Sequence, residues 1–349
     1  MHRHARILTP VALVAAGAIA LSACSTPSSG ETAAPDAAAT TVVVENAKPT
    51  LIEVTEGGET ALEEDLETPR GSVEVPFQPA SVVTFDIGTL DTLHAIGAGD
   101  AVVGIPDIVL PDYLAEYADL PKVGTLFEPD LEAVAELDPE LIVVAARSTA
   151  LYDDLAEITP ATIDLTAAYA GAFSPAATIE RATQLGEIFG ADEVVAGLVA
   201  GIEQTEDQLG ALAAQAGPTL MVSVSGGEYS AFAEGSRFGY FFDEVGFEPA
   251  VAAAQLPGQA GSPHGDVVSN EFILAANPSL ILALDRGAAI GDTTGGTAVE
   301  VLDNELVAQT PAGADGRIVF LPSSELYIVI SGLTGTQNVL DAIVTGLES

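Results

Sequence analysis

Three arginines follow local patterns that can bring them to one ligand. Arg147 and Arg286 come directly after short predicted strands, at 141–146 and 280–285, and Arg237 follows the turn sequence Glu-Gly-Ser. In open α/β sheets the carboxyl ends of the strands face the ligand crevice. A single arginine in an acidic chain more often pairs with a surface carboxylate. Three arginines at such positions instead indicate one shared cleft.

The charge balance gives these arginines their weight. The chain has 10 Lys and Arg against 51 Asp and Glu, a net charge of −41. Such a chain repels nucleic acid and anionic membrane surfaces. Three guanidinium groups in a partly desolvated cleft require a strongly anionic ligand. A ferric tris-catecholate, with a charge of about −3 and planar rings that stack on arginine, meets this requirement. Phosphate or a cluster of carboxylates meets it too.

The first residues predict export. A basic start is followed by an apolar run over residues 7–20 and by Leu-Ser-Ala-Cys, so residues 1–23 read as a signal peptide too short to span a membrane. Leu-Ser-Ala-Cys resembles the lipobox of bacterial lipoproteins, which implies a diacylated Cys24. Two acyl chains suffice for stable anchoring. The alternative is an ordinary signal with an incidental cysteine, although Cys24 is the single cysteine of the chain.

The remaining chain divides by composition. Residues 24–40 are rich in Ser, Thr, Pro and Ala and predict a flexible tether. We expect an N-terminal α/β lobe at 41–190, a connecting helix at 191–216 and a C-terminal α/β lobe at 217–349. The connecting helix is predicted by apolar residues at helical spacing without proline.

Strands alternate with helices in both halves, which predicts mostly parallel sheets covered by helices. In the first half we expect strands at 81–86, 101–105, 141–146 and 162–165, and helices at 90–96, 111–120, 130–137 and 150–158. Residues 41–44 and 72–75 are expected to form an edge hairpin around an acidic insertion at 56–67. In the second half we expect strands at 219–224, 280–284 and 318–321, and helices at 237–245, 271–276, 299–307 and 335–347. The cleft between two such lobes is a common place for a small ligand.

An ordered set of short motifs runs through both halves. It includes VVTFDIGTLDTL at 82–93, VVGIP at 102–106, SRFG at 236–239, NEFILAANP at 270–278 and LDNEL at 302–306. Over residues 72–349 the chain resembles the catecholate-siderophore branch of the ABC-importer binding proteins, of the petrobactin and enterobactin type. The resemblance implies a class III fold, with two Rossmann-like lobes on one long helical backbone. It also implies a monomer that hands a ferric siderophore to an ABC permease and ATPase complex, without an intrinsic cofactor.

The resemblance also assigns site residues. In such proteins three arginines face the siderophore, and the matching positions are Arg147, Arg237 and Arg286. A His and a Tyr fill iron sites that a tetradentate chelate leaves open, and they match His264 and Tyr327. The pattern departs at Tyr327, because relatives have Trp-Tyr followed by a glycine-rich turn and this chain has Leu-Tyr-Ile-Val-Ile-Ser-Gly.

Two further acids match a different role in the family. Glu132 and Glu271 each begin a predicted helix, and relatives place one such glutamate on each lobe to contact arginines of the permease. Both residues also fit as ordinary first-turn acids favoured by the helix dipole.

Rival functions find less support in the sequence. A hydrolase would need an activated nucleophile, but the sequence Ser-Val-Ser-Gly-Gly at 223–227 lacks the G-x-S-x-G elbow, so we expect no enzyme. Import of free zinc or manganese would call for more histidines than the two beyond the signal peptide. Haem or cobalamin binding and a surface adhesin stay open as alternatives. The sequence therefore predicts a lipid-anchored, extracytoplasmic binding protein for a ferric siderophore.

Overall fold

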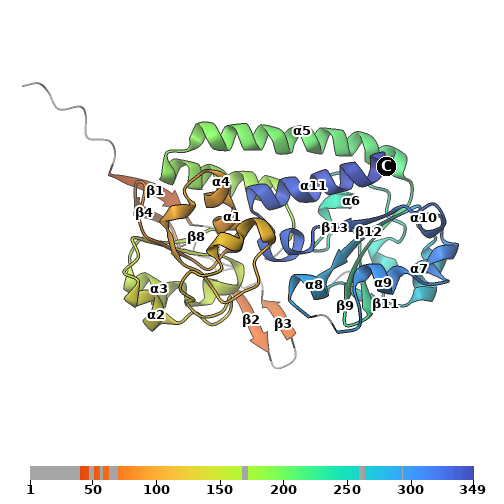
Figure 1. Cartoon of the computed structure of the whole chain (residues 1–349), viewed down its shortest axis with the longest axis horizontal. Coiled ribbons are helices and arrows are strands. Elements are labelled where there is room, and N and C mark those ends of the chain that lie inside the picture. The colour runs from red at the N-terminus through yellow and green to blue at the C-terminus, as the bar shows by residue number, and fades with distance from the viewer. Residues whose placement is uncertain are drawn as a thin grey trace, which may run out of the picture. The chain divides into compact units, whose positions relative to one another are not determined.

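Two α/β lobes, each with its own sheet, lie under a layer of long helices (Figure 1). The computed structural model describes residues 40–46, 51–55, 58–62, 70–166, 172–258, 262, 264–292 and 294–349. Of residues 51–55 and 58–62 and of Arg147 it describes only the backbone. The described residues belong to one compact unit that begins at Ala39. The predicted signal peptide and tether, with Cys24, lie outside the described residues, apart from Thr40.

The N-terminal sheet is wholly parallel, as predicted. Its order is β6-β5-β7-β8. The strands are β5 (Val82–Thr84), β6 (Val102–Gly104), β7 (Leu141–Val144) and β8 (Thr162–Asp164). Side chains alternate between its two faces, so that Val82 and Val143 join the core beneath the long helices while Val83 and Ile142 join the core on the other side.

Two helices of this lobe are shorter than the sequence predicts, one begins earlier and is longer, and one is of another type. They are α1 (Ile87–Ala95), α2 (Leu131–Glu136) and α3 (Tyr152–Ile158), with the 3₁₀ turns η1 (Gly99–Ala101) and η3 (Ala146–Leu151). The α-helix expected at 111–120 is instead a 3₁₀ helix, η2 (Asp112–Tyr117). Its buried residues, Leu114 and Tyr117, are three apart, which matches the three-residue turn of a 3₁₀ helix.

The C-terminal sheet is mixed, with order β11-β10-β9-β12-β13. The predicted parallel strands are present as β9 (Thr219–Ser225), β12 (Leu280–Asp285) and β13 (Ile318–Leu321). The sequence reading missed β10 (Glu228–Phe232) and β11 (Asp266–Val268), which pair antiparallel with each other. Gly226 and Gly227, both at positive φ, form the tight turn that reverses the chain from β9 into β10.

Short helices cover the outer face of this sheet. They are η4 (Ala253–Gln255), α7 (Asn270–Ala276), α9 (Ala298–Leu302), η5 (Val307–Gln309) and α10 (Pro311–Ala314). The helix α8 (Arg286–Ala289) instead packs on the core between the lobes through Ala289. The helix expected at 237–245 begins only at Tyr240, as α6 (Tyr240–Asp243). The helix expected at 299–307 stops at Leu302, and the chain then turns into η5.

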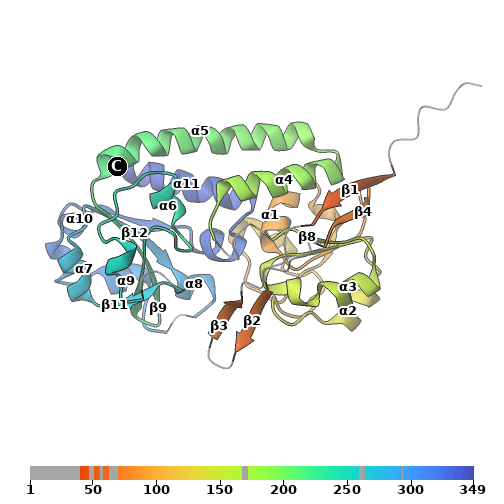
Figure 2. The ribbon, with the colours of Figure 1, turned by 180° about the vertical axis from the view of Figure 1, so that it is seen from behind.

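Three long helices cover the lobes on the side away from α2 and α3, and the longest of them runs across both (Figures 1 and 2). They are α4 (Pro175–Phe189), α5 (Asp192–Ala216) and α11 (Leu333–Glu348), and α5 packs on both of the others. Val195, Ile202, Leu209 and Ala216 recur every seven residues along the buried face of α5. The helix α4 was not predicted from the sequence. Ser174 caps its first turn, and Gly190 ends it in the left-handed conformation.

One hydrophobic core joins the two lobes. It contains Val82 of the first sheet, Leu284 of the second, Ile202 of α5 and Val339 of α11. Separate smaller cores lie on the outer face of each sheet. Because a continuous close-packed core spans both lobes, a large hinge motion would disrupt many contacts at once.

A buried carboxylate ties the C-terminal helix to the N-terminal lobe. Asp91 of α1 is fully buried and accepts hydrogen bonds from the backbone N–H groups of Thr334 (2.8 Å) and Gly335 (3.0 Å), in the first turn of α11. The Tyr113 hydroxyl donates a third bond to Asp91, at 2.5 Å. A Cβ on Gly332 would collide with this carboxylate, so the approach requires glycine there.

The predicted hairpin strands pair with each other but form a sheet of their own. β1 (Thr41–Glu45) and β4 (Ser72–Pro76) are antiparallel and do not join the edge of the main sheet. Between them the backbone of β2 (Leu51–Thr55) and β3 (Gly58–Leu62) forms a second hairpin, which the sequence reading missed. β2 packs on η3, and the hairpin projects on the side away from α5 (Figure 2). Among the described residues, no helix is both long and apolar enough to cross a membrane.

Candidate functional site

Arg286 is positioned by the end of a buried strand. It follows β12 and begins the short helix α8. The carboxylate of Asp285 accepts hydrogen bonds from the backbone N–H groups of Ala288 and Ala298, both at 2.8 Å. Through these two bonds the carboxylate of Asp285 fixes the local backbone. No carboxylate among the described residues lies within ion-pair distance of the Arg286 guanidinium.

Tyr327 lies in a π-helical turn, η6 (Glu325–Val329), that connects β13 to α11. The turn ends at Ile330, whose φ of 54° and ψ of −57° are unusual for a β-branched residue. The backbone N–H of Ser331 donates to the carbonyl of Val329 at 2.6 Å, which closes a γ-turn around Ile330. The turn thus holds Ile330 at a positive φ, at a cost of about 1–3 kcal/mol.

Two arginines hold the ring of Tyr327. Arg286 Nε donates to the Tyr327 hydroxyl oxygen at 2.8 Å, and its guanidinium carbon is 5.3 Å from the ring centroid. The Arg237 guanidinium carbon is 4.4 Å from the same centroid, and Arg237 Nη2 is 3.4 Å from the Tyr327 carbonyl oxygen. Cation–π contacts and a charge-assisted hydrogen bond therefore fix the orientation of the phenol.

Arg237 occupies a different place from the one expected. It lies in the turn between β10 and α6, three residues before the helix begins, and only 5% of its surface is exposed. The structure brings Arg237, Arg286 and Tyr327 together. Arg237 and Tyr327 are equally buried, and Arg286 is half-buried.

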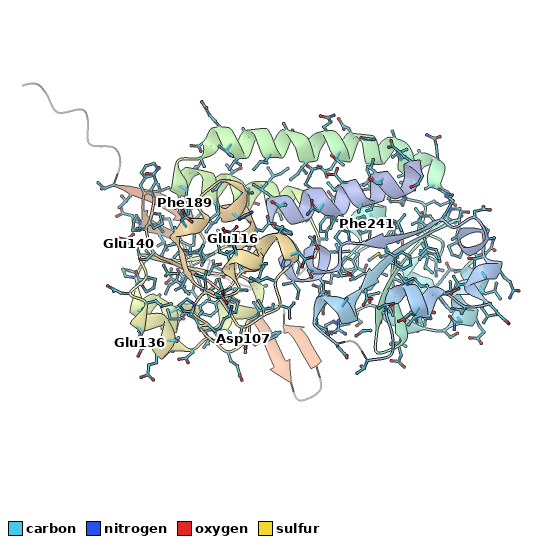
Figure 3. The ribbon with its side chains drawn as sticks, in the orientation of Figure 1. Asp107, Glu116, Glu136, Glu140, Phe189 and Phe241 are labelled. Atoms are coloured by element: carbon cyan, nitrogen blue, oxygen red, sulfur yellow. The ribbon has the colours of Figure 1, made fainter. Side chains whose placement is uncertain are left out.

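A cavity of about 450 Å³ lies next to this cluster, between the two lobes. The C-terminal lobe contributes Arg286, Ala289, Ile290, Tyr327 and Ile328, and the N-terminal lobe contributes Asp107, Ile108, Val109, Thr125, Leu126 and Phe127. Asp107 is exposed on the side of the N-terminal lobe that faces α8 (Figure 3). The described lining includes neither Arg237 nor His264.

Sequence reasoning missed the residues that the N-terminal lobe contributes. Residues 107–109 follow β6 closely, so the rule that strand ends face the ligand would have found them. Residues 125–127 form a turn in which the Thr125 hydroxyl accepts from the backbone N–H groups of Phe127 and Glu128. Local sequence gives no comparable signal for that turn.

The remaining candidates for the ligand site lie on other loops. Arg147 belongs to η3, directly after β7, and its side chain lies outside the described part of the chain. His264 is half-buried in the turn before β11, where its backbone N–H donates to the Ser262 hydroxyl at 3.2 Å.

Three other arginines serve the fold. Arg70 pairs with Asp164 at 2.7 Å and donates to the Thr149 carbonyl. Arg181 pairs with Asp86 at 3.0 Å. Arg317 donates to two backbone carbonyls, those of Ala216 and Ser279. Their contacts differ from those of Arg237 and Arg286, which share an aromatic ring beside a cavity.

Comparison with known proteins places this architecture in a family. The family model described as "Periplasmic binding protein" matches residues 82–325. The chain belongs to this family. The petrobactin-binding protein YclQ of Bacillus subtilis is 34% identical over 285 residues, which cover 80% of this chain and 86% of YclQ. Its crystal structure superposes with a TM-score of 0.70 over 80% of this chain and 96% of that one.

Two other solved structures are also similar. The TroA-like periplasmic binding protein of Xylanimonas cellulosilytica is 32% identical with a TM-score of 0.73, over 88% of this chain and 99% of its own. The periplasmic catecholate-siderophore binding protein VctP of Vibrio cholerae is 28% identical with a TM-score of 0.67, over 80% and 96%. The predicted fold class, two α/β lobes of the class III type, is thus confirmed.

The two glutamates matched to permease contacts are both exposed in the first turn of a helix. Glu132 follows Asp130, the N-cap of α2, and Glu271 follows Ser269, the N-cap of α7. A hydrogen bond from the Ser269 side chain lowers the pKa of Glu271, so the carboxylate is charged at neutral pH. Both side chains lie at the surface, where a cationic partner can reach them.

Proposed function

We propose that this chain captures a ferric siderophore of the catecholate class and delivers it to an ABC importer. The observation that carries the proposal is the Arg286–Tyr327–Arg237 cluster beside a cavity that residues of both lobes line. Two guanidinium groups and a phenol ring offer positive charge and a flat surface to an anionic aromatic chelate. The names of YclQ and VctP, relatives that bind petrobactin and a catecholate siderophore, point the same way.

In this proposal the arginines supply the charge complement. Arg286 lines the cavity and contacts the ligand directly, and Arg237 acts from behind the ring of Tyr327. Arg147 completes the set from the end of β7 in the N-terminal lobe. Positive charge on both lobes lets one anion contact the two lobes at once.

Tyr327 is the proposed direct contact with iron, together with His264. The hydrogen bond from Arg286 Nε leaves a lone pair of the phenol oxygen for a metal. Anionic oxygen donors suit a hard ferric ion, and imidazole also binds iron. A tetradentate chelate would leave two iron sites for these side chains.

Delivery needs contacts outside the cavity. We assign this role to Glu132 and Glu271, one exposed acid on each lobe, as partners for cationic residues of the permease. Acylation at Cys24 holds the chain at the extracytoplasmic face of the membrane as a monomer. The family consists of binding proteins for substrates, and binding requires no catalytic group.

Quenching of tyrosine fluorescence tests the proposal, because the chain has seven tyrosines and no tryptophan. The unacylated form, residues 25–349, is titrated with ferric complexes of bis-catecholates, tris-catecholates, citrate and hydroxamates, with haem and cobalamin for comparison. We expect tight binding of a catecholate complex. Failure of every ferric complex to bind would refute the proposed function.

Arginine variants locate the binding. Arg286→Ala should weaken catecholate binding by about 2–5 kcal/mol, because it removes a partly buried charge that meets the ligand. Lys122→Ala is the matched control, since it removes one positive charge from an exposed residue that is not among the described lining of the cavity. Equal effects of the two substitutions would show that only overall charge matters.

A further inference from the structure

The cavity has an apolar part whose role the attraction between the arginines and an anionic ligand does not explain. Beside Arg286 and Tyr327 its lining includes Ile108, Val109, Leu126, Phe127, Ile290 and Ile328. Four of these six come from the N-terminal lobe and two from the C-terminal lobe. An iron chelate held by charge alone would gain nothing from such a surface.

Two of these side chains are exposed at the place where the lobes meet. Val109 is 56% exposed and Ile290 is 42% exposed, and both line the cavity. They come from opposite lobes and lie close together: Val109 Cγ2 is 3.7 Å from the position of a Cβ on Gly291, the residue after Ile290. The exposed pair therefore forms one apolar surface, which we call the Val109–Ile290 surface.

We propose that the Val109–Ile290 surface binds the hydrocarbon frame that links the chelating groups of the siderophore. The inference rests on the proposed function and adds a second determinant of specificity to it. The iron-bound catecholates face Arg286 and Tyr327, and the linker lies across Val109 and Ile290 in the same cavity. The preferred ligand is an anionic ferric chelate with an apolar linker.

Continuity within one cavity supports this occupant. The guanidinium of Arg286, which begins α8, and the side chain of Ile290, directly after α8, are four residues apart and line the same space. A ligand anchored by Arg286 therefore reaches Ile290 without leaving the cavity. When methylene groups of the linker cover the exposed apolar side chains, the linker and the side chains both leave water. Each methylene group buried in this way strengthens binding by about 0.8 kcal/mol.

Two matched iron complexes test the inference. Both are ferric bis-catecholates of equal charge and linker length, one with an all-methylene linker and one with ether oxygens in the linker. The wild-type chain should bind the methylene-linked complex about tenfold more tightly, which corresponds to burial of about two methylene groups. Val109→Ser and Ile290→Ser should each weaken binding of the methylene-linked complex more than binding of the ether-linked complex, and so reduce this preference.

Val299→Ser is the control, because Val299 is also 56% exposed but lies on α9, outside the described cavity lining. This variant should keep the full preference. Equal wild-type affinity for the two complexes, or an equal loss of both in the serine variants, would overturn the inference and leave the proposed function standing. Failure of the wild-type chain to bind either complex would overturn the proposed function itself.

Discussion

At the scale of single residues, the site depends on how Tyr327 is held. Its hydroxyl accepts from Arg286 and its ring meets the guanidinium group of Arg237. The three side chains come from the turn after β10, the end of β12 and the turn after β13, so the sheet fixes their spacing. A preorganised phenol loses little conformational entropy when a ligand binds.

Asp107 opposes an anionic ligand. It is an exposed carboxylate in the lining of the cavity that also contains Arg286. We predict that Asp107→Asn tightens the binding of a ferric catecholate by about 0.5–1 kcal/mol, because it removes a partly screened repulsion. Titration by tyrosine quenching at low salt measures the change.

Glu136→Gln is the control for this prediction. Glu136 is exposed on α2, well away from Asp107 in Figure 3, and its neutralisation alters the net charge equally. Weaker binding after Asp107→Asn would show instead that Asp107 holds a cationic part of the ligand.

At the scale of elements, the attachment of α11 to α1 sets the position of the turn that bears Tyr327. Asp91 caps α11 from the N-terminal lobe, and η6 lies between β13 and α11. Burial raises the pKa of Asp91 to about 6, although hydrogen bonds from Tyr113, Thr334 and Gly335 and the nearby His94 act to lower it. Glu325, on η6, adds negative charge near Tyr113.

Asp91 should make stability depend on pH. Because its pKa is raised from 3.8 in the unfolded chain to about 6 in the fold, its stabilising effect is full below about pH 4 and is lost as pH rises through 6. The free energy of unfolding of the wild type, relative to Asp91→Asn, should fall by about 3 kcal/mol over this range. Urea unfolding at several pH values measures it. A difference that is constant with pH would contradict the buried, titrating cap.

A glycine of α1 makes room for the same turn. A Cβ on Gly88 would lie 2.8 Å from the carbonyl oxygen of Val329, the last residue of η6. Gly88→Ala should therefore destabilise the fold by about 1–3 kcal/mol and weaken ligand binding. Gly197→Ala is the control, since nothing lies within 4 Å of its Cβ position in α5, and it should stabilise the helix by about 0.5–1 kcal/mol. Equal shifts in the urea midpoint would refute the contact.

Some elements could be predicted from the sequence and others could not, for physical reasons. Arg286 is found because a buried strand and its end have a clear local pattern. The γ-turn at Ile330 cannot be found, because a β-branched residue at positive φ contradicts its own local preference and exists only through packing. The strand β10 alternates visibly as Glu-Tyr-Ser-Ala-Phe, but the two glycines before it are more easily read as a loop.

At the scale of the whole molecule, charge and stiffness shape how the ligand arrives. A net charge of −41 repels an anionic chelate at long range, while the arginines attract it only inside the cleft. The continuous core beneath α4, α5 and α11 limits how far the lobes can separate. The ligand therefore has to enter a cleft that is nearly formed before binding.

The association rate should respond to salt in an unusual direction. Raising ionic strength from about 0.01 M to about 0.15 M shortens the Debye length from about 30 Å to about 8 Å. Long-range repulsion is then screened, and the association rate constant for a ferric catecholate should rise by about tenfold. Stopped-flow tyrosine quenching measures it. A rate constant that falls with salt would mean that the cleft arginines dominate the field from a distance.

The central claim is that iron, in its chelate, binds between the lobes beside Tyr327 and Arg286. The most direct measurement is anomalous diffraction at the iron absorption edge from crystals of residues 25–349 grown with a ferric catecholate. We predict one strong iron peak in the cavity that Asp107, Phe127, Arg286 and Tyr327 line. An iron peak elsewhere on a chain that binds the complex in solution would contradict the account.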